Sequence, residues 1–162
     1  MTGAPGPHYP VRMAELRLVE LSATTIVAVN NLSLKPGQEQ FLAPVSYGIA
    51  ATVADPATTW QRVVVDGDEV VGFVSAGFDP DAPEEYFRSV LWRINVDADD
   101  QGRGVGRFAV EGLLEEARAR GLDVVTVIYE AGEEGPEAFF RRVGFTPTGE
   151  TEYGEVIAEI RL

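Results

Sequence analysis

Residues 101–107, which read QGRGVGR, constrain the fold of this chain more than any other segment. An apolar run at residues 89–96 precedes them and has the composition of a buried strand, and residues 108–120 follow with the spacing of an amphipathic helix. A glycine-rich turn between a strand and a helix presents unpaired backbone N–H groups at the positive end of the helix dipole. Turns of this kind bind anions, usually phosphate. The segment therefore predicts an α/β fold with a phosphate site.

Two well-known glycine motifs do not fit this segment. A P-loop has Lys followed by Ser or Thr after its last glycine, whereas Arg107 and Phe108 stand there. The dinucleotide fingerprint spaces its glycines as G-x-G-x-x-G, whereas Gly102, Gly104 and Gly106 alternate. A tight connection that binds no ligand remains an alternative, because glycine-rich turns also serve that purpose.

The segment instead fits the pattern Gln/Arg-x-x-Gly-x-Gly/Ala through Gln101, Gly104 and Gly106. This pattern is the pyrophosphate loop of the GNAT acyl-CoA N-acyltransferases. The order of strand, loop, helix, buried strand and short helix, followed by residues 142–145 (RVGF) and a final hairpin, also resembles that family. The resemblance covers residues 60–162 well and the preceding part of the chain more loosely.

This resemblance implies a GNAT-like α/β fold: a mixed, mostly antiparallel sheet of six to seven strands, with helices on both faces and a central, splayed parallel strand pair. It also implies an acetyl-CoA-dependent N-acetyltransferase, in which an amine attacks the thioester directly and no metal takes part. In the family, the backbone of the strand before the loop pairs with the pantetheine arm, and the loop amides hold the phosphates. The cofactor-binding residues that it implies are Ile94, Asn95, Val96, Gln101, Gly102, Arg103, Gly104, Val105, Gly106 and Arg107.

The general acid departs from the family pattern. The family often has a tyrosine on the helix after the central strand, which protonates the departing thiolate, and this chain has Phe140 there. Tyr129 and Tyr153 are substitutes by location. A thiolate could also leave without an acid, because a thiol pKa of about 8.5 makes it a tolerable leaving group. The missing hydroxyl keeps open a second function, that of a catalytically weak CoA-binding or regulatory module.

The expected acceptor is a small cationic amine of the di- or polyamine type. Residues 91–97 (LWRINVD) and 37–44 (GQEQFLAP) resemble bacterial polyamine (spermine/spermidine-type) acetyltransferases. Glu39 is the first candidate for the catalytic proton acceptor, because it lies in the second of these segments. Trp92 is interpreted as a core residue, with an aromatic clamp for the cation as the alternative. Further candidates for the acceptor wall or for the base are Gln38, Phe41, Tyr47, Glu84, Glu85 and Glu130.

The charge balance agrees with a cationic acceptor. The chain has 26 acidic and 13 basic residues, a formal net charge of −13. Such a surface repels nucleic acid and anionic membranes and raises the local concentration of cations. Ordinary solubility is an equally good reason for most of these charges. An acidic groove would suit an aminoglycoside equally well, and the sequence does not show whether the groove is open enough for a protein amine. Transfer to a protein amine or to an aminoglycoside therefore stays open.

Several other classes of site are excluded by composition. The chain has no cysteine, so it has neither disulfides nor thiolate ligands, which fits a cytoplasmic location. Its single histidine, His8, lies in residues 1–12, which are expected to be a disordered tail, so a histidine metal centre and a Ser-His triad are not expected. No stretch is apolar enough to span a membrane, and no secretory signal is visible. The sequence is compatible with a homodimer.

The rest of the chain, residues 13–162, is expected to form one domain. The turn Asp66-Gly67-Asp68 between two apolar runs predicts a hairpin. The expected strands are residues 13–19, 60–65, 69–76, 86–96, 122–128, 145–148 and 155–162. The expected helices are residues 22–32, 45–54, 108–120 and 136–143.

Overall fold

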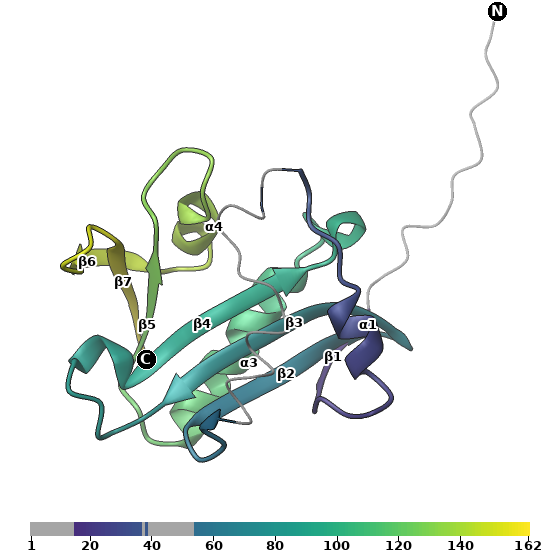
Figure 1. Ribbon diagram of the computed structural model, residues 1–162, viewed down its shortest axis with the longest axis horizontal. Helices are drawn as coiled ribbons and strands as arrows, with labels where there is room; N and C mark the ends of the chain where they lie inside the picture. Colours follow the sequence, from purple (N-terminus) through teal and green to yellow (C-terminus); the bar gives the residue numbers. More distant parts are fainter. Residues whose placement is uncertain (1–14, 37, 39–53) are drawn as a thin grey trace, which may run out of the picture.

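The computed structural model describes residues 15–36, 38 and 54–162. Within them, seven strands form one sheet in the order β1-β2-β3-β4-β5-β7-β6 (Figure 1). Every neighbouring pair is antiparallel except β4 and β5, which are parallel. This confirms the expected sheet. The strands are β1 (Leu16–Val19), β2 (Thr59–Asp66), β3 (Glu69–Phe78), β4 (Ser89–Val96), β5 (Val124–Tyr129), β6 (Thr146–Glu150) and β7 (Val156–Arg161).

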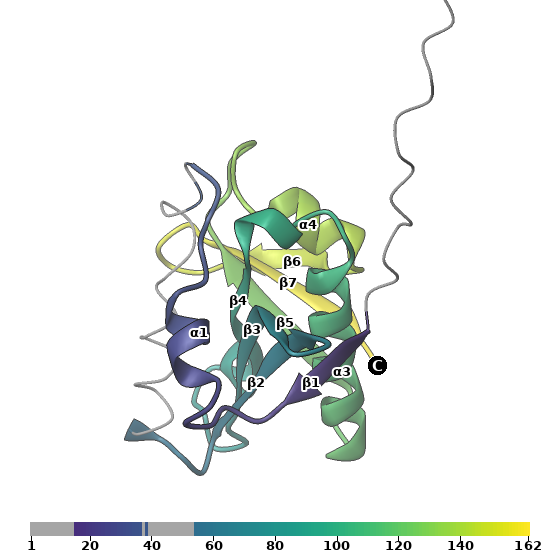
Figure 2. The same ribbon diagram turned by 90° about the vertical axis from the view of Figure 1, so that its right-hand side faces the viewer.

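Helices cover both faces of this sheet, as Figure 2 shows. The short helix α1 (Ile26–Asn30) lies on one face and the long helix α3 (Val105–Ala119) on the other. A third helix, α4 (Glu137–Arg142), follows β5. Two single 3₁₀ turns flank β4: η2 (Glu85–Phe87) before it and η3 (Ala98–Asp100) after it.

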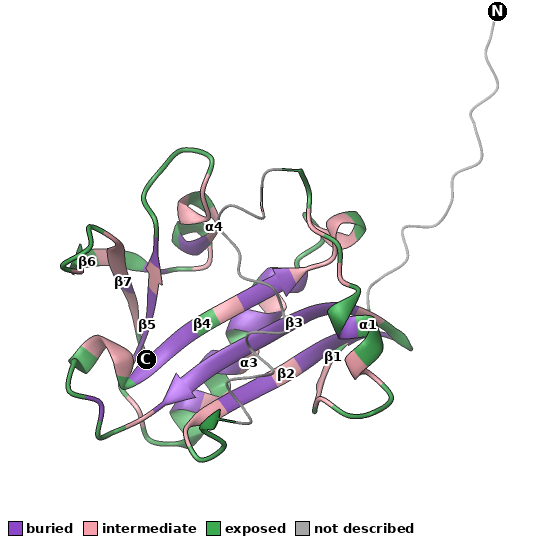
Figure 3. Ribbon diagram, viewed as in Figure 1, coloured by how far each residue is buried: buried purple, intermediate pink, exposed green. Residues whose placement is uncertain are grey.

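The hairpin of β2 and β3 carries the core on both of its faces. Asp66 pairs with Glu69 across the turn, and Gly67 has a φ of +61°, which suits glycine at a tight hairpin turn. On the α1 face, Val63 and Phe73 pack with Val29 of α1. The larger apolar cluster lies on the α3 face, and the buried strands β2 to β5 stand out in Figure 3. The predicted hairpin is confirmed.

The parallel pair is short, and this leaves an open edge. β4 pairs with β5 only at Val90 with Thr126 and Leu91 with Val127. Beyond Leu91 the edge of β4 that faces β5 has no partner strand within the described part of the chain. The expected splay of the central parallel pair therefore begins at Trp92.

A β-bulge in β4 coincides with the start of the splay. On β3, Ser75 and Ala76 are adjacent, but their partners on β4 are Arg93 and Leu91. Trp92 is thus an extra residue with no opposite partner in the ladder. It is exposed to 46%, so the interpretation of Trp92 as a core residue is wrong.

Two predicted boundaries are corrected, and hydrogen bonds explain both corrections. The helix expected at 22–32 is reduced to α1, because the hydroxyls of Ser22 and Thr25 bond within the preceding turn. The strand expected at 86–96 begins at Ser89, because residues 85–87 form η2 and the Thr126 hydroxyl donates to the Tyr86 carbonyl at 2.5 Å. The expected tail 1–12 lies outside the described residues, and so does the expected helix 45–54 except for its last residue.

Candidate functional site

The glycine loop leads directly into α3, three residues earlier than the sequence pattern predicts. Gly102 and Gly104 have φ values of +80° and +86°, a left-handed conformation that other residues adopt only under strain. A Cβ atom at either glycine would meet nothing within 4 Å, so the backbone is open to an approaching ligand. Gly104 is the N-cap of this 15-residue helix and supplies no capping side chain. The first amides of α3 therefore face the loop without a side-chain partner.

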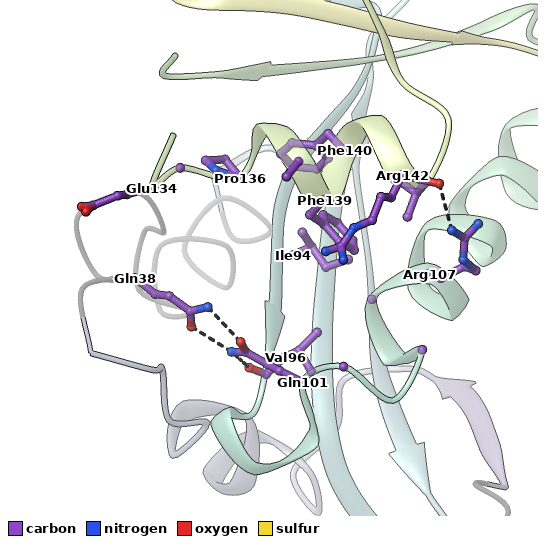
Figure 4. A pocket seen from close by; sticks show the side chains of 16 residues that line it. Gln38, Ile94, Val96, Gln101, Arg107, Glu134, Pro136, Phe139, Phe140 and Arg142 are labelled. Atoms are coloured by element: carbon purple, nitrogen blue, oxygen red, sulfur yellow. Dashed lines mark hydrogen bonds between the residues drawn. The ribbon is translucent and has the colours of Figure 1, made fainter. Parts of the chain in front are cut away.

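Gln101 ties the loop to two other segments. Its Nε2 donates to the Val96 carbonyl at 3.1 Å and to Oε1 of Gln38 at 2.8 Å. Nε2 of Gln38 donates back to Oε1 of Gln101 at 2.8 Å (Figure 4). The side chain of Gln101 is thus used to fix the loop against the end of β4, and the amides of the loop stay available for a ligand.

A cavity of about 470 Å³ lies where β4, the loop and α4 meet (Figure 4). Arg142 and Phe139 from α4 also line it. Two expected cofactor residues, Asn95 and Val105, are buried and do not line it. The expected residues that the structure brings together here are Ile94, Val96, Gln101, Gly102, Gly104, Gly106 and Arg107.

The two arginines of the loop have different partners. Arg103 does not line the cavity but forms an ion pair with Asp66 at 2.8 Å and a second one with Asp100. The hydrogen bond with Asp66 raises the pKa of Arg103, and burial raises the pKa of the Asp100 carboxyl. Arg107 lines the cavity, and its Nη2 donates to the Arg142 carbonyl at 2.8 Å.

Arg142 is a cavity residue that the sequence analysis missed. Its side chain and that of Arg107 are the cations of the cavity lining, and neither forms an ion pair with any residue that the structure describes. Its position directly before Val143-Gly144-Phe145 was a usable signal, because that segment ends α4 beside the loop.

A cluster of aromatic rings closes the inner end of the cavity. Phe140 lines it, and the Tyr129 ring stacks on Phe140 with centroids 5.4 Å apart. The Tyr129 hydroxyl is buried and has no hydrogen-bond partner among the described residues. Burial raises the pKa of Tyr129 above its ordinary value of 10.0, so the phenol stays protonated at neutral pH. Phe139 packs so closely on Gly106 that a Cβ there would come within 2.8 Å of its ring.

Tyr129 contacts Phe140 but does not itself line the cavity, and the other expected catalytic residues do not line it either. Tyr153 lies in the turn between β6 and β7, is exposed to 83%, and does not line the cavity. Glu39 lies outside the described residues, as do Phe41 and Tyr47. The remaining acidic candidates, Glu84, Glu85 and Glu130, are exposed and do not line it.

Residues 15–36, 38 and 54–162 contain neither a metal-binding cluster nor a membrane-spanning helix. No group of three or more His, Cys, Asp or Glu side chains in them could hold a metal ion. No helix among them is long and apolar enough to cross a membrane.

Comparisons with known proteins agree on one family. The chain is 32% identical to the L-2,4-diaminobutyric acid acetyltransferase of Shouchella clausii over 81 residues, which is 50% of this chain and 44% of that protein. It is 36% identical to the L-methionine sulfoximine/L-methionine sulfone acetyltransferase of Pseudomonas aeruginosa over 83 residues, 51% of this chain and 47% of that protein. The chain thus spans about half the length of the curated relatives it matches.

Solved structures with this fold span almost the whole chain. The PaiA N-acetyltransferase of Thermoplasma acidophilum, solved in complex with coenzyme A, matches with a TM-score of 0.68 at 12% identity, covering 91% of this chain and 99% of that one. The ribosomal-protein-alanine N-acetyltransferase of Brucella melitensis matches with a TM-score of 0.60 at 25% identity, covering 91% and 99%. The sequence profile described as the Acetyltransferase (GNAT) family matches residues 27–145, most of the chain. The chain therefore belongs to the GNAT acetyltransferase family.

Proposed function

We propose that this chain transfers the acetyl group of acetyl-CoA, the cofactor of its family, to the amine of a small cationic acceptor. The observation that carries the proposal is the cavity in which the glycine loop at the start of α3 meets the unpaired edge of β4. One end of this cavity offers amides and cations to phosphates, and the other offers a strand edge to an extended amide chain.

The residues of the cavity fit acetyl-CoA on three counts. Gly102 and Gly104 leave the loop backbone bare, so phosphate oxygens can approach its amides. Arg107 and Arg142 supply positive charge without an acidic partner among the described side chains. The edge of β4 beyond Leu91 leaves backbone groups for the pantetheine arm, for which Ile94, Asn95 and Val96 are proposed. Asn95 and Val105 would contribute through their backbone, because their side chains are buried away from the cavity.

Acetyl-CoA supplies a thioester carbonyl: the amine nitrogen forms the new C–N bond, the C–S bond breaks, the sulfur leaves as a thiolate, and the amine loses one proton. The chain has to orient the two reactants, accept that proton and stabilise the thiolate. Glu39 stays our candidate for accepting the proton, directly or through solvent, on the strength of its segment's resemblance to polyamine acetyltransferases.

Tyr129 is our candidate for stabilising the thiolate. Its ring packs on Phe140, which stands where the family often has a tyrosine, and its buried hydroxyl has no partner among the described residues. Because burial raises the pKa of Tyr129 above 10.0, the hydroxyl is a donor at neutral pH. Full proton transfer to a thiolate with a pKa of about 8.5 is uphill, so a donated hydrogen bond is the expected contribution. Tyr153 is the weaker substitute, because it is exposed in the β6–β7 turn.

A small cationic acceptor is favoured by the net charge of −13 and by the relatives. One of them acts, by its name, on L-2,4-diaminobutyric acid, which carries two amino groups. We propose a di- or polyamine-like acceptor of this size. The alternative is a catalytically weak CoA-binding module, and Phe140 in the cavity lining is the observation in its favour.

One assay separates these functions. Thiol release from acetyl-CoA is followed with diamines, diaminobutyrate, an aminoglycoside and a peptide with a free N-terminus, while calorimetry measures CoA affinity. Turnover with a small amine, at a rate well above that of the peptide, supports the proposal. Tight CoA binding with no turnover on any amine would make the chain a binding module. No CoA binding would remove both functions.

A further inference from the structure

A second cavity, of about 390 Å³, lies beside the other end of β4. Its walls include Asp55, Asp79, Phe87 and Trp92. Trp92 lies over Gly77, where an added Cβ would come within 2.5 Å of the indole Nε1. Gly77 is four residues from Phe73 on β3 and therefore shares its face, the one that carries α1. This cavity thus opens on the α1 face of the sheet, at the bulge where β4 and β5 part.

Three aromatic rings form a continuous ladder at this cavity. The Tyr86 and Phe87 rings meet edge to face with centroids 4.6 Å apart. The Phe87 and Trp92 rings are stacked, with centroids 5.5 Å apart and planes 29° from parallel. Trp92 keeps 46% of its surface exposed at the open end of this ladder. An exposed indole face attracts cations, because its quadrupole is negative above the ring.

Two carboxylates lie in the cavity wall beside the ladder. Asp55 and Asp79 line the cavity, and neither forms an ion pair with a described cation. Two arginines are close in the chain: Arg88, whose Nε donates to the Ala82 carbonyl at 3.0 Å, and Arg93, which follows Trp92. Burial and then the charges of three carboxylates raise the pKa of Tyr86. These carboxylates are Glu84, Glu152 and Glu155.

From this juxtaposition of an aromatic ladder and carboxylates, we propose that the second cavity binds the distal ammonium group of a di- or polyamine acceptor. The proposal rests on the acetyl transfer proposed above and names the part of the acceptor that does not react. Trp92 follows Leu91, the last β4 residue paired with β5, so a cation held there lies beside the splayed strands. Ile94, which lines the proposed cofactor cavity, is two residues further, about 7 Å along a strand, and packs in the apolar cluster on the opposite, α3 face, so the acceptor would reach from one face to the other where β4 and β5 part.

This arrangement makes the second cavity a specificity site. An acceptor with two ammonium groups several bonds apart can place one on the ladder and the other nitrogen at the thioester. A monoamine of the same length leaves the ladder and its carboxylates unused. We therefore expect diamines to have a lower KM than the matched monoamines, with the preference growing as the two nitrogens move apart up to the span of the site.

The test measures kcat and KM for diamines of two to six carbons and for the monoamines of equal length. The variants are Trp92→Ala, Trp92→Phe and Asp79→Asn, with Glu111→Gln, an exposed charge change on α3, as the control. Calorimetry with the best diamine in the absence of acetyl-CoA gives a second readout that does not depend on turnover. KM for acetyl-CoA and the thermal midpoint show whether each variant is folded.

The expected result is a rise of about tenfold in the KM for diamines in Trp92→Ala and in Asp79→Asn, with little change for monoamines. Trp92→Phe keeps an aromatic face and is expected to lose less. Added salt should raise the diamine KM of the wild type more than that of Asp79→Asn. Equal KM values for diamines and monoamines, or variants that change both alike, would overturn this inference and leave acetyl transfer standing. Absence of turnover on every amine would instead contradict the proposed function.

Discussion

The cavities at the two ends of β4 are suited to ligands of opposite charge, and different kinds of groups line them. At the C-terminal end of β4, the proposed cofactor cavity is lined by loop glycines and by Arg107 and Arg142, with Glu134 also in the lining. At its N-terminal end, the second cavity is lined by Asp55 and Asp79 beside the rings of Phe87 and Trp92. One strand thus connects the cavity proposed for a cation, at its N-terminal end, with the cavity proposed for the phosphates of acetyl-CoA, at its C-terminal end.

The two proposed sites are expected to respond differently to amino-acid substitution. The anion site depends on backbone conformation, so one substitution that alters φ or adds a Cβ damages it as a whole. At the proposed cation site several side chains act independently, and each contributes a modest share of the binding free energy. Variants at the two ends should therefore differ in the size of their effect as well as in the reactant that they affect.

The largest effect is expected from Gly104→Val. Its φ of +86° costs about 1–3 kcal/mol for a residue with a side chain, and the branched side chain fills the approach to the loop amides. We expect CoA affinity by calorimetry to fall by about 10²-fold or more. Gly149→Val is the matched control, because Gly149 has neither a positive φ nor a neighbour within 4 Å of an added Cβ. Equal affinities for both variants would remove the loop assignment.

Tyr129→Phe should reduce turnover while raising stability. Losing the hydroxyl should lower kcat by about tenfold, below the 10²–10⁴ typical of acid catalysis, because a thiolate is a tolerable leaving group. Removing a buried hydroxyl that has no partner among the described residues should raise the free energy of unfolding by about 1 kcal/mol.

The double variant Tyr129→Phe/Phe140→Tyr sharpens this test. If it recovers kcat, a hydroxyl at either position of the stacked pair serves the reaction. An unchanged kcat in Tyr129→Phe would show that the thiolate leaves without help from this side chain.

Alanine substitutions of the three arginines should have smaller effects on CoA affinity, and these effects should differ. Arg107→Ala and Arg142→Ala should each weaken CoA binding by about fivefold and reduce its dependence on salt, because both side chains line the cavity. Arg103→Ala should change CoA affinity less than either and should lower the thermal midpoint, because Arg103 pairs with Asp66. The assignment fails if Arg103→Ala weakens CoA binding most, since Arg103 would then have to leave its ion pairs for the phosphates.

The smallest expected effect is the contribution of Tyr129 to the pH dependence of the free energy of unfolding. Its folded pKa is raised above 10.0, so its contribution to stability is fully present below pH 10 and is lost as pH rises through the folded pKa. Between pH 9 and pH 11 the wild type should therefore lose more stability than Tyr129→Phe, by at most about 1.4 kcal/mol. Urea unfolding at both pH values measures this difference, and equal losses would mean that the phenol is not desolvated.

The loop end of β4 could be outlined from sequence, whereas for the other end the sequence offered Trp92 as a cation clamp only as the alternative to a core residue. The loop, the strand before it and α3 are contiguous, so the glycine spacing and the apolar periodicity identify them together. Asp55, Asp79 and Trp92 are distant in the chain and are brought together by the pairing of β2 with β3 and of β3 with β4. The exposure of Trp92 could not be read from sequence, because alternation predicts the facing of a regular strand and a bulge breaks the alternation.

Periodicity could not identify Arg142 either, although its position directly before Val143-Gly144-Phe145 could have done so. A helix of six residues carries too little periodicity to show which side chain of α4 turns toward the loop.

The bulge also bears on how this strand can change by insertion and deletion. Val74 and Ala76 are two residues apart on β3, whereas their partners Ile94 and Leu91 are three apart on β4, and all four lie in the same apolar cluster. Deleting Trp92 would bring the β4 pair back to a spacing of two and keep both side chains on the core face. A one-residue gain or loss here can thus add or remove a wall of the second cavity without reversing the faces of the strand. We therefore expect family members with one residue more or fewer at the position of Trp92 to differ in the acceptor that they use.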